Sequence, residues 1–274
     1  ARANIGYMAA GEVLAVGAGI SGYAVGDRVV TSAPHASHAL VDVTPGAAVE
    51  RIPDGVSDDV AGFIALGDVA LHAVRRARLQ IDQSVAIFGM GIVGQLVLQF
   101  ARLSGAYPLI AIDLVDERLE QAKRSGATHT INPGREDVVA RVKEFTHGTG
   151  AEAVFHCAQA AAILQSVMEC AADRGTVVLT GSPPGQATIR LKEELLRKEL
   201  VLTGTYEAGL NQTHVYWPWN RARNRRACLR LLASRQLELG HLLTHIVPAH
   251  QAPDIYSLIL AGSTGWLGVV LTWD

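Results

Sequence analysis

The sequence has few cysteines, and they are scattered. Cys157, Cys170 and Cys228 are the three cysteines among 274 residues, and they form neither a C-x-x-C pair nor an even-numbered framework. This pattern argues against a disulfide-stapled extracellular scaffold. It favours a reducing environment, so we expect a cytoplasmic protein.

The chain also lacks an excess of charge of either sign. Lysine and arginine number 24, aspartate and glutamate number 26, and the formal net charge is −2. This balance argues against a general surface for nucleic acid or for anionic membranes. With 49% hydrophobic and 18% charged residues, the composition is that of a globular protein with a full core, and the length predicts about two domains.

No apolar run is long enough to predict a transmembrane helix. The longest lies around residues 85–100, where glycine interrupts it and Gln95 and Gln99 fall within it, as is typical of a core element. No signal-peptide pattern is present. Because the chain begins at Ala1 without methionine and enters a strand pattern within a few residues, we expect that a natural N-terminal segment precedes it.

The most informative motif is a glycine-rich turn after a short apolar strand. Residues 85–88 read as a buried parallel strand, and Gly89, Gly91 and Gly94 follow in G-x-G-x-x-G spacing. In such a turn the first glycine permits the tight bend, the second lets the backbone approach a pyrophosphate, and the third allows close helix packing. The motif predicts a dinucleotide-binding site.

The segment that follows this turn has the pattern of a helix. Apolar residues recur at helical spacing over residues 92–104, and Gly105 stands where a left-handed cap belongs. The backbone N–H groups of Gly91, Ile92 and Val93 would then face the phosphates at the positive end of the helix dipole.

A second strand pattern, residues 107–112, ends at Asp113, which lies 19 residues after Gly94. A carboxylate at this point can accept hydrogen bonds from both hydroxyls of the adenine ribose, and it repels a 2′-phosphate. We therefore predict NAD rather than NADP as the cofactor. Arg118, five residues further on, is the residue that could instead accommodate a phosphate.

Strand and helix patterns alternate through the middle of the chain, which predicts an α/β fold with a doubly wound parallel Rossmann sheet. A smaller β-rich domain precedes it, with short strands separated by glycines up to residue 43. We place a first part of this smaller domain at residues 1–67, the dinucleotide-binding domain at 68–206 and a second part of the smaller domain at 207–274. The expected elements are strands at 11–16, 27–31, 39–43, 84–88, 107–112, 128–131, 153–156, 175–180, 200–205, 242–247 and 268–273, and helices at 58–78 (broken near Gly67), 92–104, 116–125, 135–146, 160–171, 222–234 and 252–261.

Together with the nucleotide turn, three further segments resemble signatures of the medium-chain dehydrogenase/reductase superfamily, the zinc alcohol dehydrogenase relatives. Residues 17–29 are similar to V-G-x-x-V-x-x-x-x-x-G-D-R-V, residues 126–132 to G-A-x-x-x-I-N, and residues 243–248 to L-I-T-H-x-x-P. The resemblance implies a GroES-like catalytic domain around a Rossmann domain, with the substrate cleft between them. It also implies a homodimer formed through an edge strand near residues 200–205.

The same resemblance implies where the nicotinamide end of the cofactor binds. Gly181 and Ser182 follow the fifth strand of the Rossmann pattern, and Gly204 and Thr205 follow the sixth. In the family such residues hold the nicotinamide largely through backbone groups.

The departures from the family pattern concern zinc. Where zinc-dependent members carry G-H-E, this chain has Tyr7 between Gly6 and Met8, and where they place a cysteine ligand just before a glycine it has Ala65-Leu66-Gly67. The four-cysteine structural zinc lobe is also missing. Tyrosine and methionine are poor zinc ligands, and a catalytic zinc needs three protein ligands, so we predict a zinc-independent member with no metal site.

Without zinc, another group must take the proton of the alcohol. Tyr7, which stands at the position of the lost histidine ligand, is the first candidate: it could act as acid or base, or could only line the pocket. His35 and His38 lie in the segment that replaces the zinc lobe, where each could relay a proton or be a surface histidine. His72 lies on the helix that leads into the Rossmann pattern, close to Asp68, which could orient a proton carrier or cap the helix.

An arginine-rich segment with two tryptophans, residues 216–226, is unusual because its arginines fall in a first helical turn, where they oppose the helix dipole. These arginines could bind an acidic or phosphorylated substrate, contact a partner protein, or simply be solvated. The segment is similar to that of zinc-less relatives in sugar and secondary-metabolite pathways, which points to a bulky polyol-like alcohol.

The leading hypothesis is an NAD-dependent, zinc-independent oxidoreductase that interconverts a secondary alcohol and a ketone, with a sugar, polyol or natural-product intermediate as its small-molecule substrate. An NADPH-dependent quinone or enone reductase of the same superfamily is the first alternative. The second is an NAD-binding regulatory or scaffold protein without catalysis.

Overall fold

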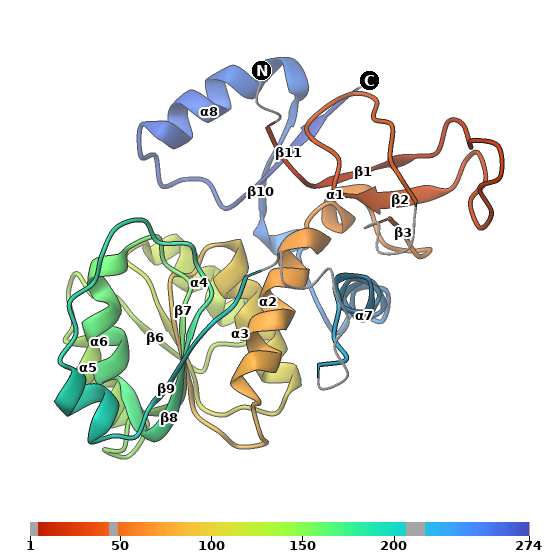
Figure 1. Ribbon diagram of the computed structural model, residues 1–274. Coiled ribbons are helices and arrows are strands. Elements are labelled where there is room, and N and C mark those ends of the chain that lie inside the picture. The colour runs from red at the N-terminus through yellow and green to blue at the C-terminus, as the bar shows by residue number, and fades with distance from the viewer. Residues whose placement is uncertain (1–4, 44–48, 207–216, 274) are drawn as a thin grey trace. The chain divides into compact units, whose positions relative to one another are not determined.

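The computed structural model describes residues 5–43, 49–206 and 217–273. They form two compact units, one made of residues 1–68 and 207–274 and the other of residues 69–206. We call the first the split unit, because two distant parts of the chain build it, and the second the Rossmann unit. Figure 1 shows the elements of both.

The Rossmann unit contains a six-stranded parallel sheet in the order β6-β5-β4-β7-β8-β9. The order reverses at β4, because β4 pairs with β5 on one side and with β7 on the other. The strands are β4 (Val85–Phe88), β5 (Leu109–Ile112), β6 (His129–Ile131), β7 (Ala151–His156), β8 (Ala171–Leu179) and β9 (Val201–Gly204). This arrangement confirms the predicted doubly wound α/β fold.

Helices cover both faces of this sheet. In Figure 1, α5 and α6 lie on the opposite side of the sheet from α2 and α3. Every residue of β4 and β5 is buried, as expected for strands with helices on both faces. The helices are α2 (Ile64–Ala77), α3 (Ile92–Leu103), α4 (Asp116–Ser125), α5 (Val138–Phe145) and α6 (Leu164–Glu169), preceded by the short η1 (Ala161–Ile163).

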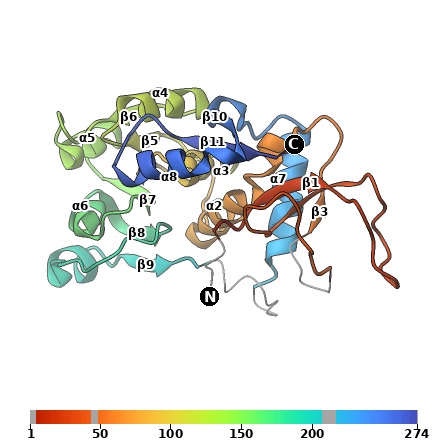
Figure 2. The same cartoon turned by 90° about the horizontal axis from the view of Figure 1, so that it is seen from above.

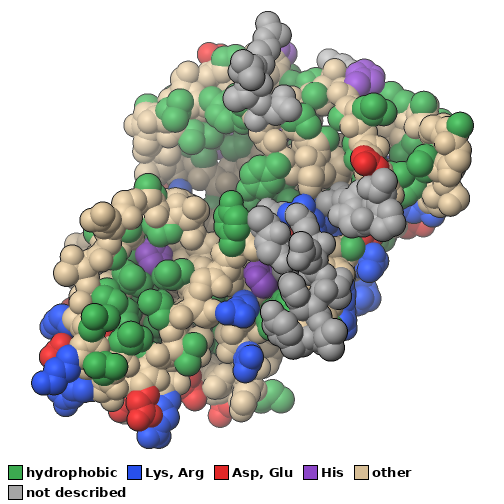
Figure 3. Space-filling model, viewed as in Figure 1, with side chains coloured by type: hydrophobic (Ala, Val, Ile, Leu, Met, Phe, Trp, Pro, Cys, Tyr) green, Lys and Arg blue, Asp and Glu red, His purple; other side chains and the backbone are tan. Residues whose placement is uncertain are grey.

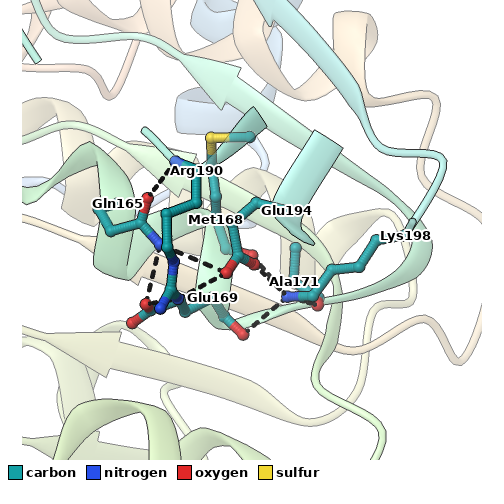
Figure 4. A network of polar contacts seen from close by, with 7 residues as sticks. All are labelled: Gln165, Met168, Glu169, Ala171, Arg190, Glu194 and Lys198. Atoms are coloured by element: carbon teal, nitrogen blue, oxygen red, sulfur yellow. Dashed lines mark hydrogen bonds and ion pairs between the residues drawn. The ribbon is translucent and has the colours of Figure 1, made fainter. Parts of the chain in front are cut away.

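A buried carboxylate organises one end of the Rossmann unit, where the π-helical segment η2 (Leu191–Leu196) packs against α6 and β8. The Glu194 side chain accepts hydrogen bonds from Arg190 Nη2 at 2.8 Å and from Gln165 Nε2 at 3.3 Å, and it pairs with Lys198 Nζ at 3.0 Å (Figure 4). Burial alone would raise the pKa of Glu194, but Lys198 and Arg190 outweigh it and hold that pKa below the ordinary value. The charged cluster therefore fixes η2 in place.

The outer surface of the Rossmann unit is mixed in character. Figure 3 shows acidic and basic side chains interspersed at the end where α5 and α6 lie, with hydrophobic side chains at the surface of the same unit. Leu196 on η2 is 68% exposed, and Val201 on the edge strand β9 is 53% exposed. Within the described ranges, every helix is too short or too polar to cross a lipid bilayer.

The described residues of the split unit form short strands and helices, which Figure 2 shows from a second direction. An antiparallel sheet has the order β1-β2-β3, and β10 pairs with β11 in parallel. The elements are β1 (Ala9–Glu12), β2 (Arg28–Thr31), β3 (Glu50–Arg51), α1 (Asp58–Ala61), α7 (Arg221–Ala233), η4 (Gly240–Leu242), β10 (Leu243–Pro248), η5 (Ala249–Gln251), α8 (Ala252–Leu260) and β11 (Gly268–Thr272).

Three sequence expectations were wrong here. The strand expected at 11–16 is β1, which ends at Glu12, and the strand expected at 39–43 is an irregular segment in which Leu40 is fully exposed. The predicted break near Gly67 falls instead at Gly62, since Gly67 lies inside α2. A Cβ at Gly67 would lie 3.2 Å from Cys228 Sγ, so this glycine serves close packing against α7.

Candidate functional site

Two of the three glycines in the nucleotide turn are required by packing. Gly89 has φ of +91°, and a Cβ there would lie 2.7 Å from the backbone nitrogen of Ala158. A Cβ on Gly94 would lie 1.9 Å from the carbonyl oxygen of Gly89. Any side chain at either position would force the strand, turn and helix apart, which is why the sequence can form this turn only with glycine.

Gly91 differs from its neighbours, because no atom lies within 4 Å of the place a Cβ would occupy. It is the N-cap residue of α3, and no side chain caps the N-terminus of that helix. Ile92 and Val93 begin the helix, so the first turn presents backbone N–H groups and the positive end of the helix dipole beside an open space. An uncapped helix start beside open space is the arrangement that can bind a phosphate, as the glycine motif predicts for the pyrophosphate of a dinucleotide.

Asp113 follows β5 directly and is 8% exposed. Its Oδ2 accepts the backbone N–H of Met90 at 2.7 Å, and its Oδ1 accepts that of Val115 at 2.9 Å. Each carboxylate oxygen has a further lone pair, so the side chain can still accept a hydrogen bond from a ribose hydroxyl. Arg118 Nη1 lies 3.8 Å from Asp113 Oδ2, which brings the two residues singled out for cofactor choice side by side.

The predicted nicotinamide-binding residues follow the carboxyl ends of β8 and β9, where doubly wound sheets bind their ligands. Gly181 donates its N–H to the His156 carbonyl at 2.9 Å, and Thr205 donates its N–H to the Leu179 carbonyl at 3.0 Å. Gly204 ends β9, and Ser182 is exposed. Because the sheet already uses these two N–H groups, Gly181 and Thr205 would meet a ligand through their carbonyl oxygens.

Cys157, which lies near this edge of the sheet, has an unreactive thiol. Burial raises the pKa of the Cys157 thiol to about 12, against which a hydrogen bond with Thr180 has the smaller effect. The thiol therefore stays protonated at neutral pH and is a poor nucleophile.

In the split unit, His35 lies against Gly6, the residue before Tyr7. Gly6 has φ of +86°, and a Cβ there would lie 2.1 Å from the imidazole Cδ2 of His35. The backbone N–H of His35 donates to the Ile5 carbonyl at 2.9 Å, and its Nδ1 lies 3.0 Å from the hydroxyl of Tyr256 on α8. Tyr7 itself is 51% exposed. Sequence reasoning missed Tyr256, because 221 positions separate it from His35.

The other two histidine candidates lie apart from this cluster. His38 is exposed and contacts the Ser37 hydroxyl at 3.2 Å, on the wall of an apolar hollow of about 380 Å³ in the split unit. His72 is buried in α2 and belongs to the Rossmann unit. Burial, with smaller effects of Arg76 and Arg75, lowers the pKa of His72 to about 4, so this imidazole is neutral at pH 7.

The arginine-rich segment is explained largely by ion pairs within the split unit. Asp68 is fully buried in α2 and lies 3.7 Å from Arg221 Nε and 3.8 Å from Arg225 Nε. Asn224 Nδ2 donates to Asp68 Oδ1 at 2.9 Å. Asp68 is therefore the ion-pair partner of two arginines on α7, and not a helix cap or an unpaired acid.

The two remaining arginines also have partners. Arg226 Nη1 donates to Glu50 Oε1 at 3.2 Å, and the Arg223 guanidinium lies 3.8 Å from the centroid of the Trp219 ring. These contacts account for the charges without an acidic or phosphorylated substrate. Tyr216, the first residue of the segment, lies outside the described residues.

Comparison with known proteins gives a consistent result. A family model described as "Zinc-binding dehydrogenase" matches residues 93–219. The chain is 28% identical to sorbitol dehydrogenase from Bacillus subtilis (strain 168), over 91% of this chain and 75% of that protein. It is 26% identical to D-guloside 3-dehydrogenase from Escherichia coli (strain K12), over 92% of this chain and 72% of that protein.

A solved structure shares the fold. The crystal structure of 2R,3R-butanediol dehydrogenase from Bacillus subtilis superposes with a TM-score of 0.80 at 22% identity, covering 98% of this chain and 80% of that one. The likeness therefore extends over both units and not only over the Rossmann sheet.

Proposed function

The chain belongs to the medium-chain dehydrogenase/reductase superfamily, and on this premise we propose that it is an NAD-dependent, zinc-independent oxidoreductase that interconverts a secondary alcohol and a ketone. At the level of reaction class it is an alcohol dehydrogenase-like oxidoreductase. The observation that carries the proposal is the pairing of the open turn at Gly91 with the Asp113 carboxylate at the end of β5.

The choice of NAD is supported by where Asp113 is held. The Met90 N–H donates to its Oδ2 at 2.7 Å beside the glycine-rich turn, and the side chain is nearly buried at 8% exposure. A 2′-phosphate placed beside that charge would suffer repulsion of like charges with little water to screen it, whereas ribose hydroxyls would donate to it.

Zinc independence is supported by the residue types at the ligand positions. Tyr7 and Ala65 stand where zinc-dependent members of the family carry ligands. Among residues 5–43, 49–206 and 217–273, no three His, Cys, Asp or Glu side chains come together in a way that could hold a metal ion. A catalytic zinc needs three protein ligands, and these positions do not supply them.

We propose that His35 takes the proton of the alcohol. A nicotinamide cofactor, when bound, would supply the hydride acceptor, so a side chain of the protein has to take the hydroxyl proton. Packing lowers the pKa of His35 below 6.5, so its imidazole is a neutral base at pH 7. We propose Tyr7, which is 51% exposed, as a wall of the substrate site.

The substrate class is proposed from the relatives and from the chemistry. Sorbitol and a guloside are the substrates in the names of two similar proteins, and both present secondary hydroxyl groups. We propose a polyol, a sugar or a related natural-product intermediate as the substrate of this chain, acted on in a reducing cytoplasm where Cys157, Cys170 and Cys228 stay free. A homodimer through the exposed edge of β9 belongs to the same proposal.

One observation favours a second candidate. Arg118 lies 3.8 Å from Asp113 and its side chain is 30% exposed, so it could turn toward a 2′-phosphate. In that event the protein would be an NADPH-dependent quinone or enone reductase.

The test is a paired titration with NADH and NADPH, read by energy transfer from tryptophan to the reduced nicotinamide, followed by turnover of polyols and secondary alcohols with NAD. Preference for NADH with turnover supports the proposal. Preference for NADPH supports the reductase, and tight NADH binding without turnover of any alcohol or ketone supports a regulatory or scaffold protein.

A further inference from the structure

The contact between His35 and Tyr256 carries an inference that rests on the proposed function and deepens it. The Nδ1 atom of His35 lies 3.0 Å from the Tyr256 hydroxyl, although the two residues come from opposite ends of the chain. The half-buried tyrosine is carried by α8, while His35 stands in the irregular segment after β2. Such a contact holds one ring nitrogen and leaves Nε2 as the atom that can react.

The position of the imidazole is set from two further directions. The His35 backbone N–H is bound to the Ile5 carbonyl at 2.9 Å, and the ring packs on Gly6, where a Cβ would lie 2.1 Å from Cδ2 and 2.4 Å from Nε2. Gly6, with φ of +86°, thus makes the room that the ring fills, one residue before Tyr7. A histidine held at its backbone, its ring face and Nδ1 has little rotational freedom left.

We propose that Tyr256 is a positioning residue for His35, whose Nδ1–H donates to the Tyr256 oxygen so that the lone pair of Nε2 is kept for the substrate. When the alcohol loses hydride from its carbon, for which a bound nicotinamide would be the acceptor, its O–H bond breaks, the proton forms an N–H bond at Nε2, and the O–H electron pair forms the C=O bond of the ketone. The imidazolium then releases that proton to water. In ketone reduction the same nitrogen returns the proton.

The state of the phenol suits this role. Burial raises the pKa of Tyr256 above its ordinary value, so the hydroxyl stays neutral and its oxygen can accept from Nδ1 while its own proton faces away from the ring. Free histidine mostly carries its proton on Nε2, and a fixed acceptor at Nδ1 reverses this preference.

The experiment compares wild-type protein with Tyr256→Phe by nitrogen-15 NMR of the histidine side chains at pH 8, with His35 assigned by His35→Gln. We expect the Nδ1–H tautomer for His35 in the wild type and the ordinary Nε2–H tautomer in the variant. His38, three positions away and exposed, is the internal control and should not change.

The second readout is steady-state alcohol oxidation with NAD. We expect Tyr256→Phe to lower kcat about tenfold with little change in KM, in line with lost general-base positioning. Tyr107→Phe, a matched change at an exposed tyrosine of the Rossmann unit, should leave kcat unchanged.

The outcomes separate the two levels of the proposal. An Nε2–H tautomer in the wild type, or a tautomer that does not move in Tyr256→Phe, overturns the positioning role even if alcohol is oxidised. A tautomer that moves while kcat stays the same overturns the link to proton transfer. NADH binding without oxidation of any alcohol overturns the proposed function itself, and with it the catalytic part of this inference, while the NMR result still reports on the contact.

Discussion

The Asp113 carboxylate accepts the backbone N–H of Met90 at 2.7 Å and thereby joins the end of β5 to the middle of the glycine-rich turn. One side chain thus has two tasks: it holds the turn in shape and presents a negative charge at its edge. The turn and the acid are 23 residues apart, so the structure couples the phosphate end of the site to the ribose end.

Replacing Asp113 should weaken binding of the cofactor. We expect Asp113→Ala to raise the dissociation constant for NADH about tenfold or more, because a hydrogen bond to a charged acceptor contributes about 1.5–3 kcal/mol. The preference over NADPH should shrink in the same variant. Fluorescence titration with both reduced cofactors measures these changes.

The matched control is Asp116→Ala, three residues further on. Asp116 is exposed and paired with Arg135 at 2.7 Å, so its loss should leave NADH affinity unchanged. Equal effects of the two substitutions would show that Asp113 acts through general charge and not through a contact with the cofactor.

The glycines of the turn predict a contrast between stability and binding. Gly91→Ala adds a methyl group in open space, so thermal unfolding should stay within about 1–2 °C of wild type while NADH affinity falls, because the methyl occupies the place of the pyrophosphate. Gly94→Ala places a Cβ 1.9 Å from the Gly89 carbonyl oxygen and should instead lower the unfolding temperature by several degrees. Unchanged NADH binding in a stable Gly91→Ala protein would contradict the assignment of the turn.

The buried ion pairs of Asp68 predict a strong effect on stability. Asp68→Asn removes the charge that faces Arg221 and Arg225, and Arg225 is only 1% exposed. Leaving one buried charge without its partner costs about 3–5 kcal/mol of unfolding free energy, measured by chemical denaturation. Arg226→Ala removes a pair in which the arginine is 60% exposed and Glu50 is 14% exposed, so it should cost less than the fully buried pair, about 1 kcal/mol. Comparable losses in the two variants would show that burial does not set the energy of these pairs.

His72 predicts acid sensitivity of the fold. Its pKa is lowered from 6.5 to about 4 in the folded protein, so the unfolded chain binds a proton between these values that the folded chain does not. Its contribution to stability is therefore complete above pH 6.5 and is lost as the pH falls toward 4, by at most about 1.4 kcal/mol per pH unit.

Denaturation curves at several pH values between 4 and 7 would test this. His72→Gln should flatten the dependence, and His38→Gln, at an exposed position, should not. An unchanged slope in His72→Gln would assign the acid sensitivity to other groups.

The Rossmann unit could be predicted from the sequence because its information is local. The apolar run of residues 85–88, the spacing of Gly89, Gly91 and Gly94, and the acid at Asp113 lie within one strand-helix-strand segment, and each is found in its predicted place. Parallel strands buried on both faces give an unambiguous apolar pattern. The structure places β4 between β5 and β7, at the point where the strand order of a doubly wound sheet reverses.

The split unit could not be predicted to the same depth because its contacts are distant in the sequence. Asp68 and Asn224 are 156 positions apart, and the sequence pattern does not indicate that the arginines of α7 face a buried aspartate. Residues 39–43 alternate like a strand, yet alternation does not supply a neighbouring strand, and Leu40 remains exposed. His35 was found by its residue type, whereas Tyr256 needed the fold.

The construction of the split unit from residues 1–68 and 207–274 also sets an order of events during synthesis. Translation delivers Asp68 to the ribosome exit long before Asn224 and Arg225, its partners on α7, have been made. The Rossmann unit, encoded between them, has all of its strands available earlier and can fold as a unit while the ribosome is still working. We therefore expect a nascent chain stopped before α7 to contain a folded Rossmann unit while its other half remains open to proteases.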